Sequence, residues 1–224
     1  MIFGSEFSPT SLWQGCVLAT IAHAIFSTQH PELANEQSWD GGNYNLQDTQ
    51  GTLGTVTFAK EGVVGAFFDS HSSRSPFSSS AVYRLNDRLE DMPSDLRDLS
   101  DRETLQYLIQ DLNGINTSVI TAAFWGHGGQ LVAAEPWPDV FSNGAHLIGT
   151  QLQPAEEAIA LWQSHYGLST GQVGFMRSLY VRKLAAGELK IVLTEQDKNE
   201  LTRQGSQGLE QGRDLLAGIA IIIP

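Results

Sequence analysis

Residues 43–69, NYNLQDTQGTLGTVTFAKEGVVGAFFD, contain three short strand patterns separated by two tight turns. Tyr44 and Leu46 alternate with polar residues, and β-branched and aromatic residues follow at 55–58 and 63–68. Each turn carries a glycine, which adopts backbone conformations that other residues avoid. Strands joined by connections this short pair antiparallel, so the stretch predicts a β-meander.

The rest of the chain adds helices and further strands to this meander. Residues 12–28 form a pattern that is apolar over most of a helix circumference, which is typical of a helix inside a core. Pro154 is suited to start another helix. Further helices are predicted at 81–90, 102–112, 170–186 and 195–217, and further strands at 117–125, 130–134 and 145–152.

These patterns predict an α+β fold, in which an antiparallel sheet is packed by helices and followed by a mostly helical C-terminal region. Residues 1–152 are expected to form the α+β core, with an N-terminal helix and antiparallel strands at 43–69 and 117–134. Residues 153–224 are expected to form a helical region that packs on the same core. A chain of 224 residues fits one such domain.

The formal net charge is −12, from 25 acidic and 13 basic residues. Binding to nucleic acid requires lysine and arginine to neutralise phosphates, and docking on an anionic membrane requires basic patches, so both functions are disfavoured. The charge permits a basic protein partner. The acidic residues are spread along the chain, which is also what a well-solvated surface requires.

Cys16 is the only cysteine, so the chain cannot form an internal disulfide, and a reducing cytoplasm is the expected location. Residues 12–26 lack charged side chains, but no basic residue precedes them and polar residues interrupt them, so we expect a core helix, not a signal peptide. His23 lies seven residues after Cys16, about 10.5 Å along a helix, too far for a nucleophile and its base. A buried structural thiol is therefore expected.

Residues 123–129, AFWGHGG, resemble the apolar strand followed by Gly-His-Gly of the caspase-like cysteine peptidases. That family also requires a nucleophilic cysteine after a later strand. No cysteine follows residue 16, so the resemblance does not extend to that activity. The chain also lacks the Gly-rich phosphate loop, the dinucleotide-binding fingerprint and the HExxH, GxSxG and CxxC motifs.

Five residues remain as candidates for a site. Asp69 and His71 are two apart at the end of a strand, so their side chains share one side, where they could bind metal or transfer protons if His127 joins them. Arg74, among serines, could hold an anion, and Gly128 could admit a ligand close to the backbone. The alternative for each is a polar strand end, a solvated serine-rich loop or a plain hairpin turn. No metal site and no cofactor are predicted.

Three functions remain open. The first is a soluble acidic interaction protein, such as an immunity or inhibitor protein that binds a more basic protein partner and has no enzymatic activity. The second is a small hydrolase or metal- or ligand-binding enzyme with a pocket near Asp69, His71 and His127. The third is a structural or assembly subunit that forms a homo-oligomer through the apolar segments at 12–26 and 215–223.

Overall fold

The computed structural model describes residues 1–78, 83–127, 129–203 and 205–224. The described chain divides into two compact units. The first unit comprises Met1–Ser11 and Gly42–Gly149, and the second comprises Leu12–Gly41 and Thr150–Pro224. The expected boundary near residue 153 is close to the start of the last stretch. Residues 12–41, however, are grouped in the second unit with the C-terminal helices.

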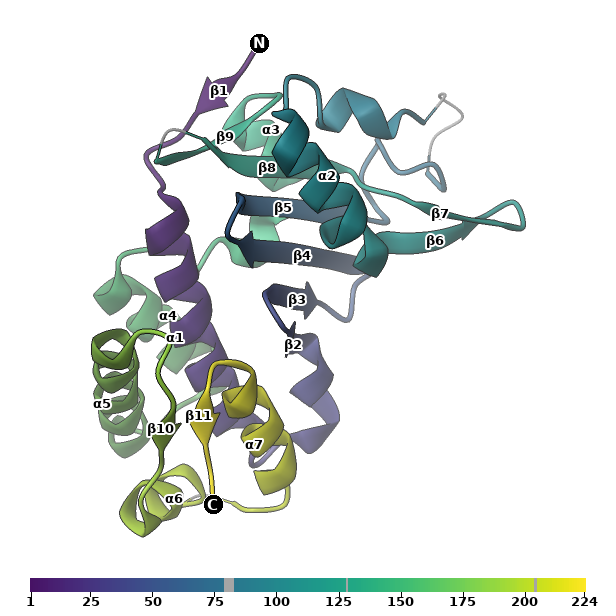
Figure 1. The fold of residues 1–224 in the computed structure, drawn as a ribbon. Helices are drawn as coiled ribbons and strands as arrows, with labels where there is room; N and C mark the ends of the chain where they lie inside the picture. Colours follow the sequence, from purple (N-terminus) through teal and green to yellow (C-terminus); the bar gives the residue numbers. More distant parts are fainter. Residues whose placement is uncertain (79–82, 128, 204) are drawn as a thin grey trace. The chain divides into compact units, whose positions relative to one another are not determined.

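The predicted meander forms one half of the sheet in the first unit (Figure 1). Strands β3 (Asn43–Gln47), β4 (Thr52–Ala59) and β5 (Gly62–Asp69) pair antiparallel in sequence order. Within the sheet, the strands of this unit follow the order β1-β9-β8-β5-β4-β3, where β1 is Phe3–Gly4, β8 is Ala122–His127 and β9 is Gln130–Ala133. The predicted α+β fold is confirmed.

Two strand glycines allow aromatic rings to lie flat on the sheet. A Cβ atom at Gly54 would approach the Phe67 ring to 2.2 Å, and one at Gly65 would approach the Phe124 ring to 2.3 Å. Both rings are fully buried. A strand glycine that another group covers closely is typical of such positions, so these glycines are required by packing and not by a turn.

Helix α2 (Ser94–Arg102) covers one face of this sheet (Figure 1). Leu96 and Leu99 pack with Val64 of β5 and Trp125 of β8 in a buried cluster. The helix that we predicted at 102–112 is wrong, because only the short 3-10 segment Thr104–Leu108 forms there before strand β6 (Ile109–Leu112) begins. In the predicted helix at 81–90, the described part contains only the 3-10 turn Leu85–Arg88, and residues 81 and 82 lie outside the described residues.

Strand β6 forms a hairpin with β7 (Ile115–Ser118), separate from the main sheet. The single strand predicted at 117–125 is therefore two strands, β7 and β8, which belong to different sheets. The predicted strand at 145–152 is also wrong, because a 3-10 turn at Ala145–Ile148 follows helix α3 (Trp137–Ser142). Apolar runs this short do not distinguish a strand from a helical turn.

The second unit is mainly helical and includes helix α1 (Pro9–Ser27) from Leu12 onward. Its core gathers apolar side chains from α1, α4 (Ala155–Tyr166), α5 (Thr170–Ala186) and the C-terminal elements. Helix α5 has the predicted bounds and starts at a capping box formed by Ser169 and Gln172. None of the described helices is long and apolar enough to cross a membrane. The remaining elements of this unit are the 3-10 turn Pro31–Glu36, β2 (Gln37–Asp40), β10 (Ile191–Val192), α6 (Glu195–Leu201), α7 (Leu209–Gly218) and β11 (Ile221–Ile222).

The helix predicted over 195–217 is interrupted, because α6 ends at Leu201 and α7 begins at Leu209. A capping box of Thr194 and Asp197 fixes the start of α6. The C-terminal segment 215–223, expected in the core, contributes five of its apolar side chains there. Its last residues form β11, which pairs with β10 in parallel.

Candidate functional site

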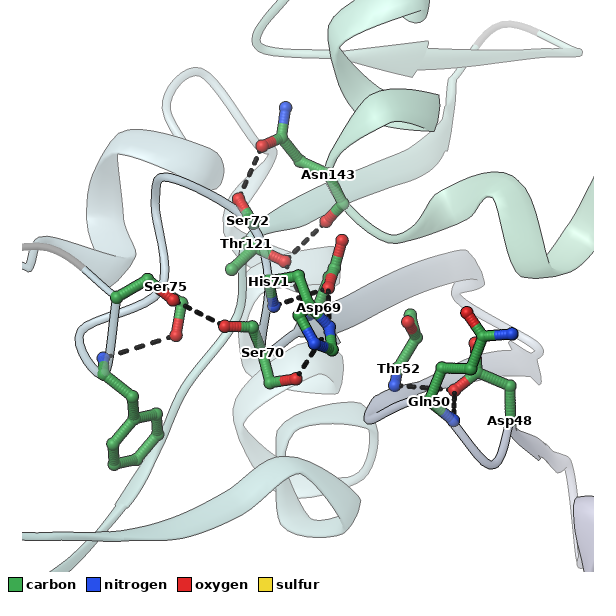
Figure 2. Close-up of polar contacts among 12 residues, drawn as sticks. Asp48, Gln50, Thr52, Asp69, Ser70, His71, Ser72, Ser75, Thr121 and Asn143 are labelled. Atoms are coloured by element: carbon green, nitrogen blue, oxygen red, sulfur yellow. Dashed lines mark hydrogen bonds and ion pairs between the residues drawn. The ribbon is translucent and has the colours of Figure 1, made fainter.

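The carboxyl end of β5 carries the candidate residues Asp69 and His71 (Figure 2). Asp69 pairs with Thr52 at the start of β4, next to the turn that joins β3 to β4. Asp48 shapes this turn, because its Oδ1 accepts the backbone N–H groups of Gln50 and Thr52, each at 2.8 Å. The β3–β4 turn, an Asx-type turn, therefore lies beside the loop that follows Asp69.

The carboxylate of Asp69 is fixed by the main chain. Its Oδ1 accepts the backbone N–H of His71 at 2.8 Å. The backbone N–H of Asp69 donates to Thr121 Oγ1 at 2.9 Å. The Asp69 side chain is 13% exposed, whereas the His71 ring is 76% exposed. The two side chains lie together, as the sequence predicts, with His71 Nδ1 3.7 Å from Asp69 Oδ1. The cause is a turn and not an extended strand, because β5 ends at Asp69.

The arrangement does not make a nucleophile triad. A Ser-His-Asp triad places the serine and the carboxylate on opposite nitrogens of the imidazole. Here Ser70 Oγ lies 3.2 Å from His71 Nδ1, the same nitrogen that faces Asp69. A hydroxyl and a carboxylate that share one nitrogen cannot pass a proton through the ring, so the geometry supports a polar turn and not acyl transfer.

The serine-rich segment that follows is tied down over its described part. Ser72 Oγ donates to Asn143 Oδ1 at 2.6 Å and accepts the Arg74 backbone N–H at 3.1 Å. Ser78 Oγ donates to the Ser70 carbonyl at 2.6 Å. The segment therefore consists of hydrogen-bonded turns through residue 78, and residues 79 and 80 lie outside the described residues.

Arg74 is not free to hold an anion, because Glu135 occupies its guanidinium. The two side chains form two contacts of 2.7 Å each, and Arg74 Nη1 also donates to the Thr121 carbonyl at 3.1 Å. Arg88 Nη1 donates to Oε2 of the same carboxylate at 2.9 Å. With Glu135 only 11% exposed, this arginine–glutamate–arginine cluster joins three parts of the chain and has a structural role.

His127 does not meet Asp69 and His71. Val64 lies opposite Trp125 in the register of β5 and β8, which places His127 at the level of Gly62. Gly62 and Asp69 are the two ends of β5, about 23 Å apart at 3.3 Å per residue. The pocket expected near these three residues therefore does not form, because they lie at opposite ends of the sheet. Gly128 lies outside the described residues.

Among the described residues, no group of three or more His, Cys, Asp or Glu side chains could hold a metal ion. The hydrogen-bonding partners that complete the strand end, Thr121 and Asn143, were missed from the sequence. They lie more than 50 residues beyond Asp69, and no local pattern indicates which polar residue a strand end will contact. Glu135 was missed for the same reason.

The first unit carries most of the negative charge of the chain, whereas the sequence suggested that the charge is evenly spread. The unit contains fourteen acidic and six basic residues, a net charge of −8, out of −12 for the whole chain. Six exposed carboxylates gather in one stretch, the acidic segment, made of Asp87, Glu90, Asp91, Asp95, Asp98 and Asp101. The charge is therefore more concentrated than an even spread along the chain.

Helix α2 displays part of the acidic segment because its two faces differ. Leu96 and Leu99 are buried on the sheet, whereas Asp95 and Asp98, three residues apart, share the exposed side of the helix. Three of the four arginines nearby are already engaged by acidic groups, whereas Arg84 is exposed and forms no ion pair within the described residues. Arg88 binds Glu135, Arg97 binds Asp101, and Arg102 binds Glu61 and Glu103.

Four carboxylates of the acidic segment remain without an ion pair in the part of the chain that the structure describes. They are Asp87, Glu90, Asp95 and Asp98. Of the other two, Asp91 accepts the terminal ammonium of Met1 at 2.8 Å, and Asp101 pairs with Arg97. Like charges held close together on a folded surface repel one another, so a cationic partner would relieve that repulsion.

The second unit contains the two residues considered first for nucleophilic catalysis. Cys16 is fully buried, and burial raises the pKa of its thiol well above the ordinary value, so it is not a ready nucleophile. The predicted structural thiol is confirmed. His23 is also fully buried, but it belongs to a different contact network.

The hydrogen bonds of His23 define its tautomer. Nε2 lies 3.3 Å from the Ala34 carbonyl, which can only accept, so Nε2 carries the proton. Nδ1 must then accept from the Tyr166 hydroxyl at 3.0 Å, and that hydroxyl oxygen accepts from Gln37 Nε2 at 3.2 Å. Burial lowers the pKa of His23 to about 4 and raises that of Tyr166, so both groups are neutral near pH 7. The network is satisfied internally and leaves no ring nitrogen for a ligand.

Comparison with family models, with curated proteins and with solved structures finds no match for this chain.

Proposed function

We propose that this chain is an acidic interaction protein, of the immunity or inhibitor type, that binds a more basic protein partner through the acidic segment. The observation that carries the proposal is the set of exposed carboxylates on and before α2 that lack ion pairs within the described residues. Three of the four arginines of the same region, Arg88, Arg97 and Arg102, are already paired with acidic groups. The surface therefore presents net negative charge that the described chain does not itself compensate.

The physical basis is electrostatic complementarity. A concentrated charge of one sign attracts an oppositely charged partner from a distance and raises the rate of association. Such an interaction weakens with salt, because the Debye length falls from about 10 Å at 0.1 M to about 3 Å at 1 M. Binding is therefore expected to be fast and strongly dependent on ionic strength.

A hydrolase is a weaker alternative. It requires acidic and imidazole groups that converge, and His127 lies at the other end of the sheet from Asp69. His71 and Asp69 alone supply two groups, an exposed ring and a largely buried carboxylate, without a third to position substrate. No observation on the described residues favours this function over protein binding.

The test compares two variants with the same net charge. The first neutralises the four unpaired carboxylates of the acidic segment, and the second neutralises four exposed carboxylates of the second unit. Each changes the charge from −12 to −8, so a difference between them reports position and not total charge. The first variant carries Asp87→Asn, Glu90→Gln, Asp95→Asn and Asp98→Asn, and the second carries Glu157→Gln, Glu188→Gln, Glu210→Gln and Asp214→Asn.

The measurement is a pull-down at low and high salt from a lysate of the source cells, followed by titration of any stoichiometric partner. We expect a basic protein whose affinity falls by roughly fourfold to several hundredfold in the acidic-segment variant, given about 0.2–1 kcal/mol for each of the four lost charge pairs. The control variant should bind like the unmodified chain. Recovery of the chain alone, or of a partner that binds both variants equally, contradicts the proposal.

A further inference from the structure

The tip of the β6–β7 hairpin carries one of the two Asn-Gly dipeptides of the chain, Asn113-Gly114 (Figure 1). Leu112 pairs with Ile115, so Asn113 and Gly114 form the whole turn. Both have positive φ, 57° at Asn113 and 84° at Gly114, as a type I′ hairpin turn requires. Both are exposed.

The other dipeptide, Asn143-Gly144, has the opposite environment. Asn143 Oδ1 accepts from Ser72 Oγ at 2.6 Å, and Asn143 Nδ2 donates to the Asp139 carbonyl at 2.7 Å. The carbonyl of Asn143 also accepts from Thr121 Oγ1 (Figure 2). The side-chain amide is therefore held by partners on both its oxygen and its nitrogen.

We propose that Asn113 is a site of spontaneous deamidation, and that the fold protects Asn143 from the same reaction. The backbone nitrogen of Gly114 attacks the side-chain carbon Cγ of Asn113. A C–N bond forms, the Cγ–Nδ2 bond breaks, and ammonia leaves with the proton of the Gly114 amide. Water then opens the resulting cyclic imide at either carbonyl and gives aspartate or isoaspartate at position 113.

The local structure favours this reaction at the hairpin tip. Glycine has no side chain to hinder the attacking nitrogen. The Gly114 N–H donates to Asp111 Oδ1 at 2.6 Å, so a carboxylate already lies where the departing proton must go. The hairpin has only two strands, and two-stranded hairpins are marginally stable, so the tip can open to the reactive geometry at little cost.

The product changes the surface. Deamidation makes the chain more negative by one charge and places a second carboxylate near Asp111. An isoaspartate also lengthens the backbone within a two-residue turn, which the pairing of Leu112 with Ile115 does not accommodate. The modified hairpin is therefore expected to lose its turn hydrogen bonds first.

The experiment incubates the intact folded protein at mildly alkaline pH and follows both dipeptides by peptide mapping with mass spectrometry. The peptide with Asn113 should accumulate aspartate and isoaspartate at least about tenfold faster than the peptide with Asn143, because Asn143 must first break two side-chain hydrogen bonds. In urea the two sites should react at similar rates, since both are Asn-Gly. Asn113→Gln should remove the acidic species seen by anion exchange.

Three results would overturn the inference. Equal rates at the two sites in the folded protein would show that the fold does not discriminate between them. Faster reaction at Asn143 would reverse the assignment. A persistent difference in urea would place its cause in the flanking sequence and not in the structure.

Discussion

Lowering the pH from about 7 to about 5 is expected to destabilise the fold around His23 by about 2 kcal/mol through this histidine alone. The pKa of His23 is about 4 in the folded protein, against 6.5 for an ordinary histidine. Between about pH 4 and pH 6.5, His23 is therefore protonated in the unfolded chain and neutral in the folded chain. Stability is complete above the unfolded pKa and is lost as the pH falls towards the folded pKa.

The magnitude follows from the size of the shift. A displacement of about 2.5 pKa units corresponds to about 3.4 kcal/mol at full effect, of which about 2 kcal/mol is expressed at pH 5. The cause is burial, because the ring is fully enclosed and a protonated Nδ1 could no longer accept from Tyr166.

The assay is urea denaturation at both pH values for the unmodified chain and for His23→Gln, which cannot titrate in this range. Carboxylates contribute to the pH dependence of both proteins, so the relevant quantity is the difference between their two slopes. We expect the variant to be less stable at pH 7 but to lose about 2 kcal/mol less on acidification. His30→Gln, at an exposed site in the same unit, controls for the loss of a histidine. If His23→Gln and the unmodified chain lose stability equally, the reasoning is wrong.

Two further predictions concern packing and charge. Glu135→Gln should destabilise the chain by about 2–3 kcal/mol in thermal or urea denaturation, because two partly buried arginines would lose their shared carboxylate. The control, Glu61→Gln at an exposed ion pair, should cost well under about 1 kcal/mol. A small effect at Glu135 would show that the cluster is solvated. Gly15→Ala should destabilise by about 3 kcal/mol or more, because its Cβ would lie 1.8 Å from the Gln151 carbonyl oxygen. Gly174→Ala, in open space on α5, should stabilise by about 0.5–1 kcal/mol, and the opposite order of these two variants would refute the packing.

The elements that sequence reasoning placed correctly are those with strong local signals. The meander is one, because alternating side chains and glycine turns specify strands and their pairing over fewer than thirty residues. Helix α5 is another, since the capping box of Ser169 and Gln172 lies at its own start. Errors fall at 102–112 and 145–152, where short apolar runs suit a helix, a strand or a 3-10 turn equally. At 117–125 and 195–217, one predicted element is two in the structure.

The candidate site was only half predictable. Asp69 and His71 are two residues apart in sequence, and the turn that follows β5 brings them together. The position of His127 depends on the register between β5 and β8, which the sequence of neither strand specifies. The pairing of Arg74 with Glu135 likewise depends on where a distant loop returns.

The sequence by itself determined the α+β class, the meander, the negative charge and the buried character of the first helix. Each of these rests on composition or on periodicity within a short window. Only the tertiary structure decided that residues 12–41 join the C-terminal helices, that His127 is far from Asp69, and which carboxylates remain unpaired. The physical reason is that register and ion pairing are long-range properties, set by which surfaces can be buried together and not by any local pattern.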